Sequence, residues 1–141
     1  MRRLPQLLIF VGLGLLVFDT TARADDLAVT RVDVVESEDG EIEVFARLPL
    51  RLAQMLPPPE LLGHGVFESK GYVPDRGGGI RYVLHLGDRR LSACDVLLFP
   101  WQRQAVLARF RLADGTTAQR FFRLTGSGIE VPVEAVLSED V

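Results

Sequence analysis

The sequence predicts an all-β fold: an immunoglobulin-like sandwich of about seven strands, with a small open β-barrel as the alternative. Apolar and polar residues alternate with a period of two along most of the chain, which is the pattern of half-buried strands. Turn sequences separate these segments at short intervals. The domain that remains after an N-terminal leader has about 117 residues, enough for one hydrophobic core.

That leader is the first element. Two arginines precede an apolar run at 7–18, and Ala22 and Ala24 then stand where a signal peptidase reads small residues. The apolar run is shorter than the roughly 20 residues that span a bilayer as a helix. We therefore expect residues 1–24 to be a cleaved signal peptide and 25–141 to be one domain, periplasmic or secreted, with no stable membrane insertion.

The next two segments are predicted to pair as a hairpin. Thr30–Glu36 and Glu41–Leu48 both alternate, and the turn sequence Ser37–Gly40 joins them. The residues expected to face the core are Val32, Val34, Ile42, Val44, Ala46 and Leu48.

A second hairpin is predicted further along the chain. Ile80–Leu86 alternates, and Gly87-Asp88 leads into a strand at Leu91–Phe99. This strand holds Cys94, the only cysteine, which shares its facing with Val96 and Leu98 and is therefore expected in the core as a small apolar group. A single cysteine excludes an intramolecular disulfide.

Three further strands are predicted towards the C-terminus. Val106–Leu112 and Ala118–Leu124 flank an Asp-Gly turn, and Ile129–Leu137 alternates throughout. Pro132 cannot donate a hydrogen bond to a neighbouring strand, so the last strand is expected at a sheet edge or a bulge. Trp101, at a strand end, is expected to be partly buried.

The segment Leu50–Gly79 interrupts the strand pattern. One or two helical turns are predicted near residues 50–56, followed by a triple proline and a glycine-rich loop. Long connections often carry function, so this segment is expected to border a recognition surface that includes Leu61 and Leu62. A plain crossover between two sheets is the alternative.

Charge and motifs limit the function classes. The chain carries 16 Lys and Arg against 19 Asp and Glu, a net charge of −3, which argues against general nucleic-acid binding. Gly77-Gly78-Gly79 is not followed by the Lys-Ser or Lys-Thr of a phosphate-binding loop, and no Gly-x-Ser-x-Gly motif is present. We expect a protein that is not an enzyme and needs no cofactor.

Two functions follow as alternatives. The first is an exported binding or adaptor module acting with another exported or envelope protein, through Leu61 and Leu62 or through a basic face of Arg81, Arg109 and Arg111. Those arginines occupy outward strand positions, where salt bridges to Glu41, Glu43, Glu130 and Glu134 are the simpler explanation.

The second is a periplasmic metal or redox carrier using His64, His85 and Cys94. Copper suits these ligand types, but both histidines precede the cysteine, contrary to the order in blue-copper proteins. The sequence therefore favours the binding module and assigns no metal site.

Overall fold

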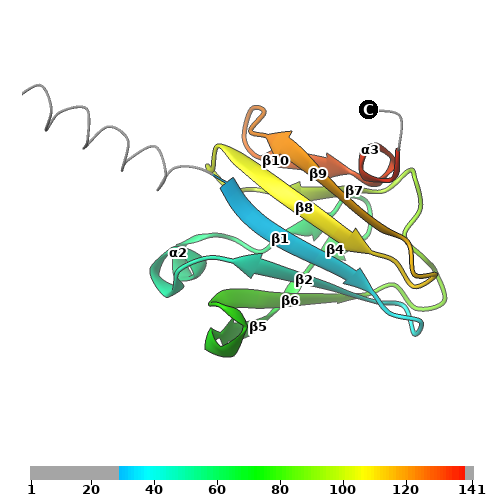
Figure 1. The fold of residues 1–141 in the computed structure, drawn as a ribbon, viewed down its shortest axis with the longest axis horizontal. Helices are drawn as coiled ribbons and strands as arrows, with labels where there is room; N and C mark the ends of the chain where they lie inside the picture. The colour runs from blue at the N-terminus through cyan, green and yellow to red at the C-terminus, as the bar shows by residue number, and fades with distance from the viewer. Residues whose placement is uncertain (1–28, 139–141) are drawn as a thin grey trace, which may run out of the picture.

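The computed structural model describes residues 29–138, which form two β-sheets packed face to face (Figure 1). The predicted signal peptide lies outside the described residues. The larger sheet has the order β5 (Glu68–Val73), β6 (Gly79–His85), β2 (Glu41–Arg47), β1 (Val29–Glu36), β8 (Ala105–Arg111), β9 (Thr117–Arg123). The smaller has the order β10 (Ile129–Pro132), β7 (Val96–Phe99), β3 (Glu60–Leu61), β4 (Gly65–Val66). The predicted all-β sandwich is confirmed, with ten strands in this part of the chain rather than seven, and the sheets do not close into a barrel.

The alternation of the first strands gives the central part of the core. β1 and β2 form the predicted antiparallel hairpin, and β8 and β9 form another. The inward residues of these strands are fully or almost fully buried, namely Val32, Val34, Ile42, Val44, Ala46, Val106, Ala108 and Phe110. β1 also pairs with β8, in parallel, from Val29 to Val35. The parallel pair joins the two hairpins into one sheet.

The prediction of a second hairpin at Gly87-Asp88 is wrong. β6 belongs to the larger sheet and β7 to the smaller, so the residues between them cross from one layer to the other. β7 begins only at Val96, because the carboxylate of Asp95 accepts the backbone N–H of Ser92 at 2.8 Å and closes a turn there. Cys94 lies in that turn and is exposed, so its predicted place in the core is also wrong.

The segment between β2 and β6 is more regular than predicted. The helical turn appears as α2 (Leu50–Met55), which confirms that part of the prediction. The residues after it form β3, β4 and β5, and a 3-10 helix, η1 (Pro74–Arg76), precedes β6. These strands were missed because two of them have only two residues each, too few for any periodicity to show.

The predicted last strand ends early. β10 stops at Pro132, and the following residues form α3 (Val133–Leu137), so a strand running to Leu137 is wrong. The backbone N–H of Val133 donates to the carbonyl of Asp95 at 2.9 Å, where the chain leaves β10. β10 is nevertheless an edge strand, as Pro132 predicted.

An aromatic pair, Phe99 and Trp101, packs in the core and is more deeply buried than predicted for Trp101. Trp101 is fully buried, not partly, and its Nε1 donates to the carbonyl of Pro57 at 2.7 Å. Its ring lies 4.8 Å from that of Phe99, centroid to centroid. The bond to Pro57 fixes the triple-proline segment against the core and satisfies the indole N–H.

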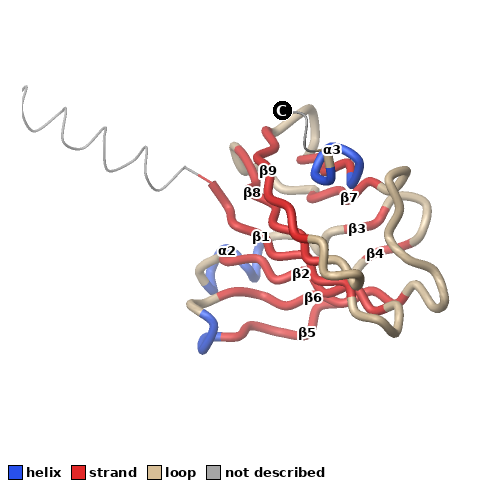
Figure 2. The backbone as a smooth tube through the Cα atoms, turned by 45° about the vertical axis from the view of Figure 1, so that its right-hand side comes forward, coloured by secondary structure: helices blue, strands red, loops and turns tan. Residues whose placement is uncertain are grey.

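The short helices lie at the margins of the two sheets (Figure 2). No helix or strand of residues 29–138 covers the outer face of the larger sheet over β1, β8 and β9 (Figure 1). No helix in residues 29–138 has the length and apolar character required to cross a membrane.

Candidate functional site

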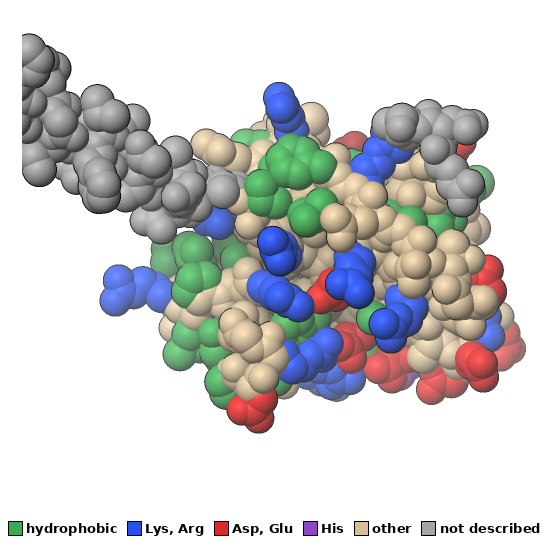
Figure 3. All heavy atoms as spheres, in the orientation of Figure 1, with side chains coloured by type: hydrophobic (Ala, Val, Ile, Leu, Met, Phe, Trp, Pro, Cys, Tyr) green, Lys and Arg blue, Asp and Glu red, His purple; other side chains and the backbone are tan. Residues whose placement is uncertain are grey.

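The uncovered outer face of the larger sheet carries a concentration of positive charge. Two adjoining open depressions on it, of about 220 and 140 Å³, share Asp33, Arg47 and Arg109 in their walls. We call the arginines that line them the arginine face: Arg31, Arg47, Arg76, Arg109 and Arg111. Figure 3 shows Lys and Arg side chains across the middle of this side of the molecule, with acidic side chains gathered on the lower rim. A chain of negative net charge thus presents a basic surface.

Strand register brings these residues together from distant parts of the sequence. The parallel pairing of β1 with β8 places Asp33 beside Arg109 and Val35 beside Arg111. The β1–β2 hairpin places Arg31 directly opposite Arg47. Two like charges on directly opposed residues of a sheet repel each other. The pairing of Arg31 with Arg47 therefore creates a positive potential that neither arginine of the pair can neutralise.

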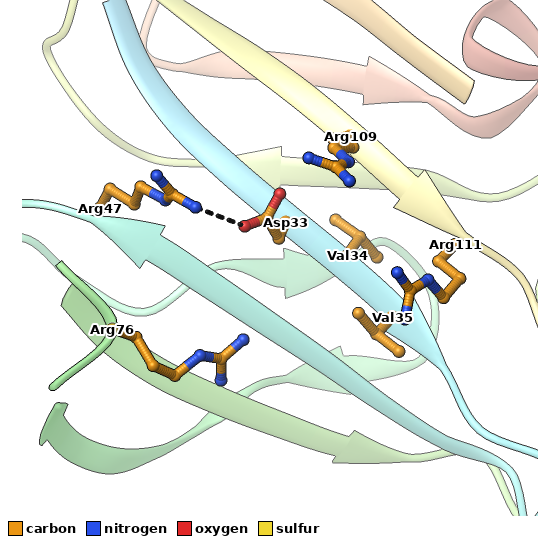
Figure 4. A pocket seen from close by; sticks show the side chains of 7 residues that line it. All are labelled: Asp33, Val34, Val35, Arg47, Arg76, Arg109 and Arg111. Carbon is orange, nitrogen blue, oxygen red and sulfur yellow. Dashed lines mark ion pairs between the residues drawn. The ribbon is translucent and has the colours of Figure 1, made fainter. Parts of the chain in front are cut away.

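Few of these arginines have an acidic partner. Asp33, the one carboxylate that the described part of the chain places in the two depressions, lies 3.8 Å from Arg47 (Figure 4). Within residues 29–138, Arg31, Arg109 and Arg111 form no ion pair and no side-chain hydrogen bond. Arg109 and Arg111 follow each other on one side of β8 and are both exposed. As far as residues 29–138 are concerned, these three guanidinium groups are free to bind an anion.

Arg81 differs from the other two predicted arginines. Its Nε donates to Glu43 at 2.9 Å, and its Nη2 lies 3.5 Å from Glu41. Arg76 adds a second bond to Glu43, at 3.0 Å. Burial tends to raise the pKa of Glu43, but the hydrogen bonds and charges of these two arginines outweigh it and lower that pKa. The simpler explanation, salt bridging, thus holds for Arg81 and not for Arg109 or Arg111.

Arg76 was not predicted, and its place depends on a close approach of the backbone. Its guanidinium lies over the ring of Phe45, 4.2 Å from the centroid, a cation–π contact. That ring occupies the space above Gly79, where an added Cβ would come within 2.6 Å of it. The glycine therefore lets Phe45, which faces outward on β2, lie flat and support Arg76.

An apolar margin adjoins the arginine face on β9. Phe121 is 47% exposed, and with Arg123, Val29 and Ala105 it borders a further hollow at the end of the sheet. Register places Phe121 beside Leu107 and Gln119 beside Arg109. The outer face thus passes from basic over β1 and β8 to mixed apolar and basic at β9.

The two predicted docking residues of the long segment, Leu61 and Leu62, differ in exposure. Leu61 is fully buried in β3, opposite Leu97, so it cannot contact a partner and its place in the binding site is a wrong prediction. Leu62 follows it and is 38% exposed. The segment thus crosses between the layers and supplies β3 and β4 of the smaller sheet and β5 of the larger one.

The predicted metal ligands are not brought together. His64 Nε2 lies 3.4 Å from Asp95 Oδ1, which Arg89 already holds at 2.6 Å, while His85 ends β6 opposite Glu41. Residues 29–138 contain no group of three or more His, Cys, Asp or Glu side chains arranged to hold a metal ion. Asp95 is a structural anchor: burial raises its pKa, but the bonds from Arg89 and Ser92 and the nearby positive charge lower it overall.

Comparison with family models, with curated proteins and with solved structures found no match to this chain, so its function is inferred from the arginine face itself.

Proposed function

We propose that this protein is an exported binding module, an adaptor that holds an acidic segment of another envelope protein against its arginine face. The observation that carries the proposal is the presence of Arg31, Arg109 and Arg111 on one face of the larger sheet, where no acidic side chain of residues 29–138 pairs with them. Export and the identity of the partner are part of the proposal and rest on the sequence of residues 1–24.

The chemistry of arginine supports this choice of ligand. A guanidinium group is planar, always charged, and matches a carboxylate with two parallel N–H donors. Arginines fixed on a sheet keep their Cα positions without further ordering of the backbone, which lowers the entropy that binding costs. Because the groups are exposed, the attraction is screened by salt.

The make-up of the face favours binding over catalysis. Among residues 29–138, those that line the two depressions include no serine, cysteine, histidine or lysine, and Asp33 lies beside Arg47. General acid–base or nucleophilic chemistry requires such groups within hydrogen-bond reach of one another. A positively charged, shallow and open surface suits an extended anionic ligand.

The test measures binding of a defined acidic probe, fluorescein-labelled poly-L-glutamate, by fluorescence anisotropy in low salt. We expect the double variant Arg109→Gln/Arg111→Gln to raise Kd about tenfold, or about 1.4 kcal/mol. The matched control, Arg51→Gln/Lys70→Gln, removes the same charge from exposed positions on α2 and β5 and should bind like wild type.

Added salt should weaken binding by wild type more than by the double variant, since fewer ion pairs form in the latter. Equal weakening in the two double variants would show that only net charge matters and would contradict the proposal. Absence of binding by the folded wild-type protein in low salt would contradict it as well.

A further inference from the structure

The sandwich has four open strand edges, and three of them carry features that prevent pairing with another strand. β5 has an irregular register between Ser69 and Gly71, β10 ends in Pro132, and β4 has only two residues. Bulges, prolines and shortness are the devices by which proteins protect their edges. Within the described part of the chain, these three edges are poor templates for a further strand.

The fourth edge, β9, lacks those devices. It has seven residues, pairs with β8 in unbroken register from end to end, and contains neither glycine nor proline. In the described residues no strand lies on its other side. Arg120 turns inward and donates to the carbonyl of Ala135 in α3 at 2.6 Å, which fixes β9 from behind. β9 is therefore a long, rigid and regular edge.

We propose that an extended acidic segment of the partner protein adds to the larger sheet as a strand beside β9, with its carboxylates on the outer side of the sheet, over Arg109 and Arg123. This inference rests on the proposed function and names the conformation of the ligand. Main-chain hydrogen bonds to an edge supply affinity in this mode of recognition, and alternate side chains supply specificity.

The geometry of the sheet supports this placement. Neighbouring strands lie about 4.8 Å apart, so a residue added beside Gln119 is about 10 Å from Arg109, two strands away, within the joint reach of a glutamate and an arginine side chain. Arg123 lies on β9 itself and is exposed. Outward side chains of an added strand recur every second residue, and a repeat of acidic residues with that period places every carboxylate on the basic side.

A second copy of this chain is a poorer occupant of the same edge. Antiparallel pairing of two β9 strands about a two-fold axis would extend both sheets into one and bring two arginine faces side by side. Such an interface adds positive charge to positive charge and supplies no carboxylate. Charge complementarity therefore favours an acidic partner over self-association.

The experiment uses a seven-residue probe of alternating valine and glutamate, labelled with fluorescein at its N-terminus and amidated at its C-terminus. Two further versions carry N-methyl groups, one on the glutamates and one on the interior valines, and keep the same side chains and charge. An added strand donates to its neighbour through the N–H groups of alternate residues only. We expect one methylated version to bind at least tenfold more weakly than the parent and the other to bind like it.

The remaining outcomes separate the two proposals. If both methylated versions bind like the parent while Arg109→Gln/Arg111→Gln still weakens binding, the arginine face holds a carboxylate ligand without strand pairing, and only this inference fails. Equal weakening of both would mark a general effect of methylation on the peptide and would also overturn it. If the parent peptide does not bind, or binds independently of the arginines, both proposals fail.

A second measurement checks the location. Amide hydrogen exchange of the full chain should slow in β9 on adding the parent peptide and not in the edge strand β5. Sedimentation of the protein alone should show a monomer. A dimer that dissociates when β9 is altered, for example by Phe121→Glu, would assign the edge to a second copy and refute the proposal.

Discussion

Replacing Glu36 by glutamine should destabilise the fold strongly although the side chain keeps its size. Glu36 lies at the end of β1 and is buried, and its two carboxylate oxygens accept different backbone N–H groups: that of Leu91 at 2.7 Å and that of Ala113 at 3.0 Å. One carboxylate therefore connects the crossover between the sheets with the β8–β9 turn.

The magnitude follows from those two bonds. A glutamine retains one accepting oxygen, so one bond survives without its charge, while the NH₂ group faces an N–H donor that then lacks an acceptor. A hydrogen bond to a charged group contributes about 1.5–3 kcal/mol, and an unsatisfied buried donor costs about 1–3 kcal/mol. We expect Glu36→Gln to lower the free energy of unfolding by about 3 kcal/mol, or the melting temperature by about 13 °C for a domain of this size.

The assay is urea denaturation at pH 7, followed through the fluorescence of the buried Trp101. The matched control is Glu38→Gln, two residues away in the exposed turn, where the change should stay within about 0.5 kcal/mol. Equal midpoints for the two variants would refute the assignment of Glu36 as a carboxylate that holds two loops.

Three further predictions concern single side chains. The pKa of Asp95 lies below its usual value of 3.8, so its charged form stabilises the fold above that pH. Wild type should therefore be much more stable than Asp95→Asn at pH 7. In urea titrations this difference in stability should shrink as the pH falls below 3.8. Tyr82→Phe should leave the melting temperature unchanged or raise it, because the buried hydroxyl of Tyr82, whose pKa burial raises to about 12, has no hydrogen-bond partner in residues 29–138; a loss above about 1 kcal/mol would reveal a bond to that hydroxyl. Cys94 should react with a thiol reagent about as fast in the native protein as in denaturant, since it lies exposed in a turn. Slow labelling of the native protein would show that the thiol is buried and would contradict this placement.

The sequence predicts well where one periodicity alone fits the residues. Val32, Val34, Ile42 and Val44 match only a strand, and they face the core as predicted. The segment Val133–Leu137 fits two periods, because its apolar residues alternate and also recur at the spacing of a helix. In the structure this segment is the helix α3, which buries Val133 and Val136 on the same side.

The candidate site was predictable only in part, for a different reason. Alternation within β8 placed Arg109 and Arg111 on the outer side, as found. It says nothing about which strands are neighbours, so the contribution of Arg31 and Arg47 could not be inferred before the parallel pairing of β1 with β8 was known. The prediction for Cys94 failed because a local hydrogen bond from the backbone N–H of Ser92 to the Asp95 carboxylate, not the apolar pattern, determines where β7 begins.

The parallel contact between β1 and β8 also constrains the order in which the chain can fold. β1 and β2 are joined by a four-residue turn and can pair as soon as both exist, whereas Val29 and Ala105, which lie side by side in the sheet, are separated by most of the domain. Closing so long a loop is slow, and until it closes β1 presents an unpaired edge rich in valine. A nascent chain that stops before β8 therefore exposes the strand that later becomes the centre of the sheet, and any factor that keeps such a chain from aggregating would have to cover β1 first.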